Sequence, residues 1–236
     1  MHFRRRRAVR RGPLRLPPST PSEIALPVCA AGRLPLTILV QGGVASGKSS
    51  VARALAELGA EVVDCDALGH EALRRPEVVA RLLEAFGPEV LDPEGQVDRD
   101  ALGARVFSDP AALARLEAIV HPLIARWVHE RLESRRTPED RPRRVVVLDA
   151  AVAERMGLDR SCDLRVFVDV PAEVRRRRAR AQRGWNPEEV DRREAHQEPL
   201  DSKRAQADAV LPNDGSPDEA MAHVKRFWKE FVEPQR

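Results

Sequence analysis

One eight-residue motif constrains the fold of this chain more than any other sequence feature. Residues 42–49 read Gly-Gly-Val-Ala-Ser-Gly-Lys-Ser, which satisfies the pattern Gly-x-x-x-x-Gly-Lys-Ser. The apolar run Thr37–Gln41 precedes the motif, and Val51, Leu55 and Leu58 follow it on one helical stripe. This order of strand, glycine-rich turn and helix is typical of a phosphate-binding loop, or P-loop.

The P-loop predicts which residues bind a nucleotide. Its backbone N–H groups point at phosphate oxygens, and the N-terminus of the following helix adds favourable partial charge. We expect Lys48 to reach the β and γ phosphates of ATP and the Ser49 hydroxyl to bind Mg²⁺. A glycine-rich turn with an exposed lysine is the structural alternative, and the motif alone does not separate kinases from GTPases or motor ATPases. The predicted nucleotide-binding residues are Gly42, Gly43, Val44, Ala45, Ser46, Gly47, Lys48, Ser49 and Ser50.

Strands and helices alternate from residue 37 onward, which favours crossover connections and a parallel sheet. Most of the strand-like runs are nearly continuous in Val, Ile and Leu, as expected for strands covered on both faces. About 80 residues of helical pattern separate the second strand from the third, too many for a plain crossover. We interpret them as a helical, substrate-binding insert. The predicted strands are Thr37–Gln41, Glu61–Asp64, Arg144–Asp149, Leu164–Val170 and Ala209–Leu211.

Two glycines and one proline predict where helices end. Gly59 and Gly87 each follow an apolar helical stripe, at the position of a C-terminal cap. Pro122 interrupts the stripe that includes Leu116, so we expect a break into two helices there. His121, next to that proline, is interpreted as a hinge residue, with a catalytic histidine as the alternative.

The positive charge of the chain is concentrated at its N-terminal end. Residues 1–36 hold eight arginines against one glutamate, and because the whole chain carries +3, residues 37–236 carry −4. An acidic body lacks the broad positive face that nucleic-acid binding needs, so we expect no nucleic-acid partner. Segment 1–36 is rich in proline and lacks a core-forming pattern, which predicts a disordered basic extension. We interpret it as a non-native or variable extension, with a transit peptide as the alternative.

Apolar content and cysteine usage both fit a cytoplasmic protein. No stretch approaches the ~18 consecutive apolar residues of a transmembrane helix, so no membrane partner is expected. The cysteines, Cys29, Cys65 and Cys162, are odd in number and lack Cys-x-x-Cys spacing. A disulfide framework or zinc site is therefore not expected, and a reducing compartment fits.

Four sequence blocks, spread over about residues 38 to 215, resemble the dephospho-coenzyme A kinase family. Val63-Asp64-Cys65-Asp66, after the second strand, resembles the family's Asp-Ala-Asp, and residues 106–110 resemble its Phe-x-Asp-Pro. Residues 116–124 resemble Leu-Glu-x-Ile-x-His-Pro-x-Ile. The family's Gln, Lys, Ala-Asp and Asn-x-Gly series is matched by Gln197, Lys203, Ala207-Asp208 and Asn213-Asp214-Gly215.

The resemblance implies an α/β P-loop NTPase fold, with a doubly wound, five-stranded parallel sheet flanked by helices. It implies a kinase domain over 37–236, with a helical acceptor insert at about 67–140 and an arginine-bearing lid at about 172–200. The implied reaction transfers the γ-phosphate of ATP to the ribose 3′-hydroxyl of dephospho-coenzyme A, the last step of coenzyme A synthesis. We expect the enzyme to be a monomer or a weak oligomer.

The resemblance also assigns catalytic roles to individual residues beside Lys48. Asp66 is the expected base for the attacking hydroxyl, because a carboxylate just beyond a strand end faces the ligand crevice of an open sheet. A helix cap before Ala67 is the structural alternative. Arg178 is the expected lid arginine, although a solvated charged face is the usual explanation of such an arginine run. Asp149 is the expected magnesium carboxylate.

The chain departs from the family pattern at three places. Ala45 stands where the family has glycine, so we expect its φ to stay negative, and Gln41 stands where the family has threonine. Residues 149–154 read Asp-Ala-Ala-Val-Ala-Glu in place of Asp-x-Pro-Leu-Leu-x-Glu. Another small-molecule P-loop kinase, acting on a nucleoside, sugar or shikimate-like acceptor, is therefore the alternative function. The guanine-reading pattern Asn-Lys-x-Asp is not found, which disfavours a nucleotide-dependent switch.

Overall fold

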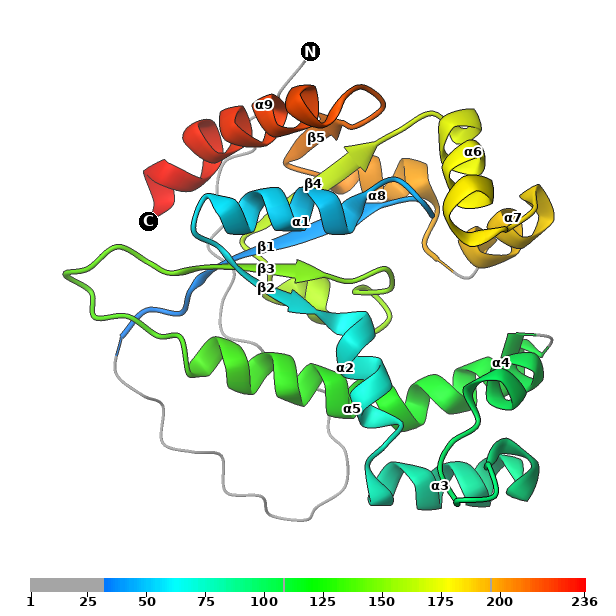
Figure 1. Ribbon diagram of the computed structural model, residues 1–236. Helices are drawn as coiled ribbons and strands as arrows, with labels where there is room; N and C mark the ends of the chain where they lie inside the picture. Colours follow the sequence, from blue (N-terminus) through cyan, green and yellow to red (C-terminus); the bar gives the residue numbers. More distant parts are fainter. Residues whose placement is uncertain (1–31, 108, 196) are drawn as a thin grey trace. The chain divides into compact units, whose positions relative to one another are not determined.

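The computed structural model describes residues 32–107, 109–195 and 197–236 (Figure 1). Most of the predicted basic extension, residues 1–31, lies outside the described residues. The chain divides into two compact units. The first combines the described residues up to Val63 with those from Arg131 onward, and the second is Asp64–Glu130.

The first unit is built on a five-stranded sheet with the strand order β2-β3-β1-β4-β5 (Figure 1). The central strand β1 pairs in parallel with β3 and β4, and β4 pairs in parallel with β5. This arrangement confirms the predicted α/β fold, and each strand ends within one residue of its predicted range. The strands are β1 Leu36–Gly42, β2 Glu61–Asp64, β3 Val145–Asp149, β4 Leu164–Asp169 and β5 Ala209–Pro212.

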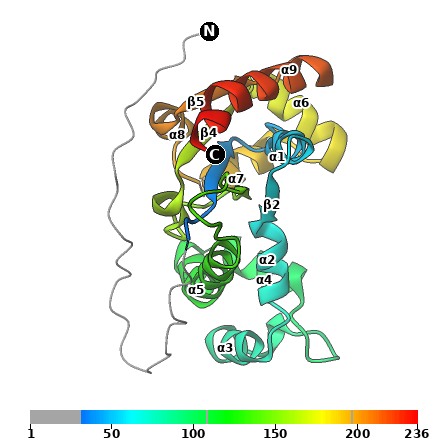
Figure 2. The ribbon, with the colours of Figure 1, turned by 90° about the vertical axis from the view of Figure 1, so that its left-hand side faces the viewer.

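The central strand is apolar because helices cover both faces of the sheet. Figures 1 and 2 show helices α1 and α9 on one face and helix α8 on the other. Leu36, Ile38 and Val40 alternate along β1 and join one core cluster with side chains of α1 and α9. The helices of this unit are α1 Lys48–Glu57, α6 Ala172–Arg183, α7 Pro187–Ala195, α8 Leu200–Gln206 and α9 Pro217–Phe227. Short 3-10 or π turns cover Leu158–Ser161, Trp228–Val232 and Glu233–Gln235.

The second unit consists of helices. Gly87 ends α3 with a φ of 86°, and Gly59 of the first unit follows the end of α1 with a φ of 102°, so both predicted helix ends are confirmed. No helix within the described ranges is long and apolar enough to cross a membrane. The helices are α2 Cys65–Ala72, α3 Pro76–Phe86, α4 Arg99–Phe107 and most of α5 Pro110–Glu133, with a 3-10 turn at Pro88–Val90.

Pro122 does not break its helix, so the predicted division into two helices is wrong. Helix α5 runs without interruption and contains Pro122 in its interior. An interior proline removes a backbone hydrogen bond and costs about 3 kcal/mol. The neighbouring side chains Ile119, Leu123 and Ile124 are buried, and full burial of such a side chain contributes about 1.5–3 kcal/mol. Burial of the apolar stripe therefore outweighs the local cost, and His121 lies inside a helix rather than at a hinge.

Residues 32–36 belong to the folded unit rather than to the predicted extension. Arg33 and Thr137 form an antiparallel bridge with N–O distances of 2.8 and 3.0 Å. The Arg136 guanidinium donates to the Gly32 carbonyl at 2.6 Å, and Leu36 is fully buried at the start of β1. These are mostly backbone contacts, which the composition of a segment does not reveal. The folded unit therefore reaches back to Gly32.

Candidate active site

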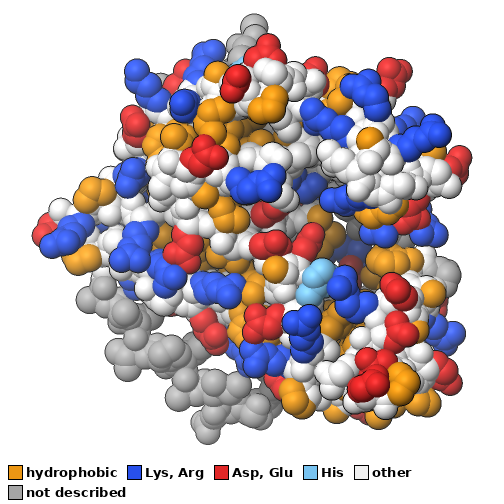
Figure 3. Space-filling view, viewed as in Figure 1, with side chains coloured by type: hydrophobic (Ala, Val, Ile, Leu, Met, Phe, Trp, Pro, Cys, Tyr) orange, Lys and Arg blue, Asp and Glu red, His pale blue; other side chains and the backbone are white. Residues whose placement is uncertain are grey.

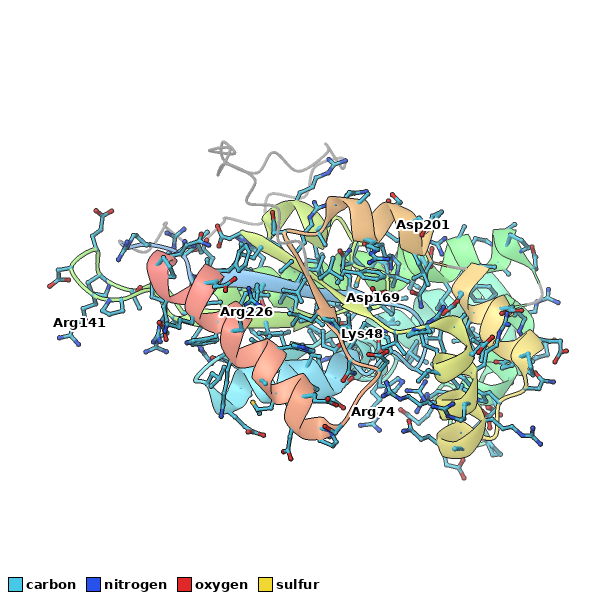
Figure 4. The ribbon with its side chains drawn as sticks, turned by 90° about the horizontal axis from the view of Figure 1, so that it is seen from above. Lys48, Arg74, Arg141, Asp169, Asp201 and Arg226 are labelled. Atoms are coloured by element: carbon cyan, nitrogen blue, oxygen red, sulfur yellow. The ribbon has the colours of Figure 1, made fainter. Side chains whose placement is uncertain are left out.

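The P-loop forms the turn between β1 and α1, in the context that the motif requires. Gly47 caps the start of α1 with a left-handed φ of 84°, which glycine adopts without steric cost. Lys48 is the first residue of α1, and its Nζ donates to the carbonyl oxygens of Gly42 at 3.1 Å and of Gly43 at 3.0 Å. The ammonium group is thus folded over the loop. Figure 4 shows Lys48 and Asp169, the last residue of β4, at the same end of the sheet.

The backbone of Ala45 has a φ of 56°, so the prediction of a negative φ is wrong. Among the described residues, it is the only one other than glycine with a positive φ. A left-handed backbone costs an alanine about 1–2 kcal/mol. Ala45 and Trp185 pack against a small apolar cluster of Val44, Ala179 and Val190. Burial of the Ala45 methyl group in this cluster offsets part of the strain.

Asn213 fixes the P-loop from a distant part of the sequence. It follows β5, is 9% exposed, and its Nδ2 donates to the Ser46 carbonyl at 2.8 Å. Its backbone N–H donates to the Asp169 carbonyl at 3.0 Å. A β-carbon added to Gly47 would collide with the Asn213 side-chain amide. Glycine at position 47 is therefore needed for this close approach as well as for its φ.

Ser49 and Asp149, the predicted magnesium ligands, lie on α1 and β3. Ser49 is an exposed residue in the first turn of α1. Asp149 ends β3 and is paired with Val40 near the end of β1. The described part of the chain holds no group of three or more His, Cys, Asp or Glu that could bind a metal alone. Mg²⁺ at such sites takes one or two protein ligands together with phosphates and waters, so none is required.

Within the predicted lid, the arginine that lies against the P-loop is Arg175, which the sequence analysis did not single out. Its Nε donates to the Val170 carbonyl at 3.1 Å, and its Nη1 forms an ion pair with Glu194 of α7. A β-carbon added to Gly43 would lie only 2.5 Å from the same Nη1. Arg178 follows one helical turn later, is partly buried, and takes no part in the ion pairs of the described lid residues. Its catalytic role stays a prediction.

Other arginines of the lid connect α6, α7 and the turn between them. Arg176 and Asp191 form an exposed ion pair at 2.9 Å. The guanidinium groups of Arg183 and Arg193 lie 4.7 and 4.0 Å from the centre of the Trp185 ring, distances at which cation–π attraction is effective. Figure 3 shows several basic side chains on the part of the surface formed by α6 and α7.

Lys203 of α8 anchors the segment where the chain departs from the family pattern. It is 1% exposed, and its Nζ donates to the Ala151 carbonyl at 3.0 Å and lies 3.8 Å from Glu154 Oε2. Burial lowers the pKa of Lys203, while the Glu154 carboxylate opposes this shift. Glu154 also accepts a hydrogen bond from the side chain of Gln41. The segment after β3 is thereby tied to α8 and to the end of β1.

Asp66 lies in the second unit, in the first turn of α2. The cap of this helix is Asp64, whose Oδ1 accepts a hydrogen bond from the Ala67 N–H at 2.9 Å. The alternative interpretation of Asp66 as the helix cap is therefore wrong. Its role as a base stays a prediction.

The matching family model and the most similar curated relatives belong to one family. The sequence model of the dephospho-CoA kinase family matches residues 36–219. The dephospho-CoA kinase of Symbiobacterium thermophilum is 41% identical over 189 residues, which cover 80% of this chain and 78% of that protein. The crystal structure of TT1252 from Thermus thermophilus is 35% identical with a TM-score of 0.71, and the match covers 85% of this chain and 100% of that one. A dephospho-CoA kinase from Campylobacter jejuni, 21% identical over 83% of this chain and 96% of that one, has the same fold with a TM-score of 0.54.

The extent of the family match is more informative than the P-loop. Many nucleotide-binding proteins share a P-loop, whereas this match continues through the helical unit to Asn213 and beyond. The chain belongs to the dephospho-CoA kinase family.

Proposed function

We propose that this chain transfers the γ-phosphate of ATP to the ribose 3′-hydroxyl of dephospho-CoA, the last step of coenzyme A biosynthesis. The observation that carries the proposal is a P-loop with its lysine in place, at the carboxyl end of a doubly wound sheet, in a chain of this family. Open α/β sheets bind ligands at that end. We also propose a cytoplasmic setting and a monomer or weak oligomer.

The P-loop supplies position and charge to the phosphates. Backbone N–H groups of residues 42–50 would hold them, and the Lys48 ammonium would exchange its two loop carbonyls for phosphate oxygens. Arg178 would add a positive charge from the lid. Phosphoryl transfer needs in-line alignment and charge stabilisation more than covalent help from the protein.

The metal would be held at one edge of the cradle. The Ser49 hydroxyl and the Asp149 carboxylate are its proposed protein ligands. When bound, Mg²⁺ would neutralise negative charge that develops on the transferred phosphoryl group.

Asp66 is the proposed general base. It follows β2 by two residues, and its carboxylate is not the helix cap. Accepting the proton of the 3′-hydroxyl would make that oxygen a stronger nucleophile toward the γ-phosphorus.

A coupled assay with ATP, Mg²⁺ and dephospho-CoA tests the proposal. Turnover should be seen with dephospho-CoA, and nucleoside, sugar or shikimate acceptors should give little. Preference for one of those acceptors would favour the alternative kinase function. Lys48→Ala should lower turnover by orders of magnitude while the protein stays folded, and normal turnover in that variant would exclude the P-loop assignment.

The role of Asp66 is separated from helix capping by a matched pair of variants. Asp66→Asn should slow single-turnover transfer by about 10²- to 10⁴-fold with ATP affinity nearly unchanged, because an amide cannot take the proton. Asp64→Asn keeps a capping oxygen and should be nearly normal. An Asp66→Asn enzyme with more than about a tenth of wild-type turnover would show that Asp66 is not the base.

A further inference from the structure

We propose that the Glu194 carboxylate occupies a phosphate position of the P-loop and is displaced when a nucleotide binds. Arg175 then binds the incoming phosphate. The inference rests on the proposed role of residues 42–50 as the ATP cradle. It adds two lid residues to that cradle.

One oxygen of Glu194 reaches the P-loop from α7. Its Oε1 accepts a hydrogen bond from the backbone N–H of Val44 at 2.8 Å, and the same oxygen pairs with Nη1 of Arg175. The side chains of Glu194 and Arg175 are 20% and 8% exposed. A β-carbon added to Gly43 would lie 2.7 Å from this oxygen. The carboxylate oxygen thus lies between a P-loop N–H and a buried guanidinium and accepts a hydrogen bond from each.

An anionic oxygen between a backbone N–H and a guanidinium is the environment that a phosphate oxygen takes in such loops. In this structure a carboxylate of the same chain takes that place. Charge-assisted hydrogen bonds are among the stronger ones in proteins, so Glu194 stabilises the loop in this conformation. A phosphate that arrived beside an undisplaced Glu194 would meet a second negative charge. Nucleotide binding is therefore coupled to release of Glu194.

Arg175 has an anchor that does not depend on Glu194. Its Nε donates to the carbonyl of Val170, one residue beyond the end of β4. Two residues earlier, Val168 is the register partner of Gly42. The guanidinium consequently stays beside the loop when Glu194 leaves. A buried guanidinium without a counter-ion is strongly unfavourable, so the phosphate replaces the carboxylate as its partner.

The lid contains a matched pair that does not touch the P-loop. Arg176 and Asp191 connect the same two helices at 2.9 Å, but their side chains are 46% and 57% exposed. Such exposed pairs contribute little to stability. Asp191→Asn therefore removes one connection between α6 and α7 while the contact with Val44 is retained.

Calorimetric titration of Glu194→Gln tests the displacement. Glutamine keeps an oxygen for the Val44 N–H but removes the negative charge. ATP and ADP should bind about tenfold more tightly than to the wild type, the factor expected when a charge-assisted bond no longer competes. Adenosine, which has no phosphate, should bind unchanged, and Asp191→Asn should alter none of the three affinities. An unchanged ATP affinity in Glu194→Gln, or an equal gain for adenosine, overturns the displacement.

The role of Arg175 is tested in the Glu194→Gln background, because Arg175→Gln alone leaves a carboxylate without its partner and destabilises the fold. The double variant should bind ATP about tenfold more weakly than Glu194→Gln if the guanidinium contacts phosphate. Equal affinities would mean that Arg175 only neutralises Glu194. Thermal unfolding of both variants confirms that they are folded.

Lys48→Ala in the same titration separates this inference from the proposed function. If Lys48→Ala impairs ATP binding or turnover while Glu194→Gln has wild-type affinity, the displacement alone is overturned. If Lys48→Ala has wild-type turnover, the assignment of the cradle itself fails.

Discussion

Replacing Asn213 with alanine should destabilise the conformation of the P-loop, although no residue of the loop itself is changed. The variant loses the donor that holds the Ser46 carbonyl at 2.8 Å, in a residue that is fully buried. An unsatisfied buried carbonyl costs about 1–3 kcal/mol. If ATP must restore the loop to its bound shape, that cost appears in binding, and the Kd for ATP should rise about tenfold or more. The Asn213 backbone N–H still donates to Asp169, so β5 should stay in register.

The assay is calorimetric titration with ATP, together with thermal unfolding and the KM for dephospho-CoA. Asp214→Ala, at the exposed neighbouring position, is the control and should behave as the wild type. The KM for dephospho-CoA should hardly change in Asn213→Ala. If the variant unfolds at lower temperature but keeps its ATP affinity within about twofold, the contact supports the fold and does not set the loop.

The contacts of Lys203, of Ala45 and of residues 32–35 can each be tested with one altered chain. Lys203→Met should remove a pH dependence of the free energy of unfolding. Burial lowers the pKa of Lys203 below 10.5, so near that pH the unfolded chain binds more protons than the folded one. In denaturant titrations, the wild type should therefore gain stability relative to the variant as the pH rises toward 10.5. A difference independent of pH would contradict this. Ala45→Gly relieves the strain of a φ of 56° but loses a packed methyl group, so denaturant unfolding should show a gain of less than about 1 kcal/mol, whereas a clear loss would mean that packing dominates. A chain beginning at Gly32 should match the full chain in turnover and thermal stability. One beginning at Leu36 lacks the contacts with Thr137 and Arg136, and its free energy of unfolding should fall by about 2–4 kcal/mol. Equal stability of the two truncated chains would show that residues 32–35 contribute nothing to the stability of the fold.

The sheet could be predicted from the sequence because its strands are covered on both faces. Continuous apolar runs such as residues 145–148 locate a parallel strand closely, and the P-loop motif fixes the turn after β1. Local rules failed where tertiary packing opposed them. Pro122 lies inside a helix whose apolar side chains are buried, and Ala45 takes a left-handed backbone beside Trp185.

The lid was harder to predict for a different reason. A run of arginines from Arg175 to Arg178 contains no contrast between polar and apolar positions, so its inward face cannot be located from the run itself. Ala179 is the residue that could have located the buried face of α6. It is small and fully buried, and it lies one turn after Arg175 on the same side of the helix. Glu194 gave no signal, because its partner Val44 is 150 residues away.

The central position of β1 has a consequence for synthesis of the chain. β1 is made before both of its neighbours: Ile38 pairs with Val147 on one side and with Leu164 on the other. Pairings so distant in sequence must first overcome the entropy of closing long loops, which slows folding. The amide of Asn213 that holds Ser46 arrives 167 residues after it. A nascent chain therefore carries a P-loop sequence without the shape to bind ATP until residue 213 has left the ribosome, and capture on an ATP resin should distinguish finished chains from unfinished ones.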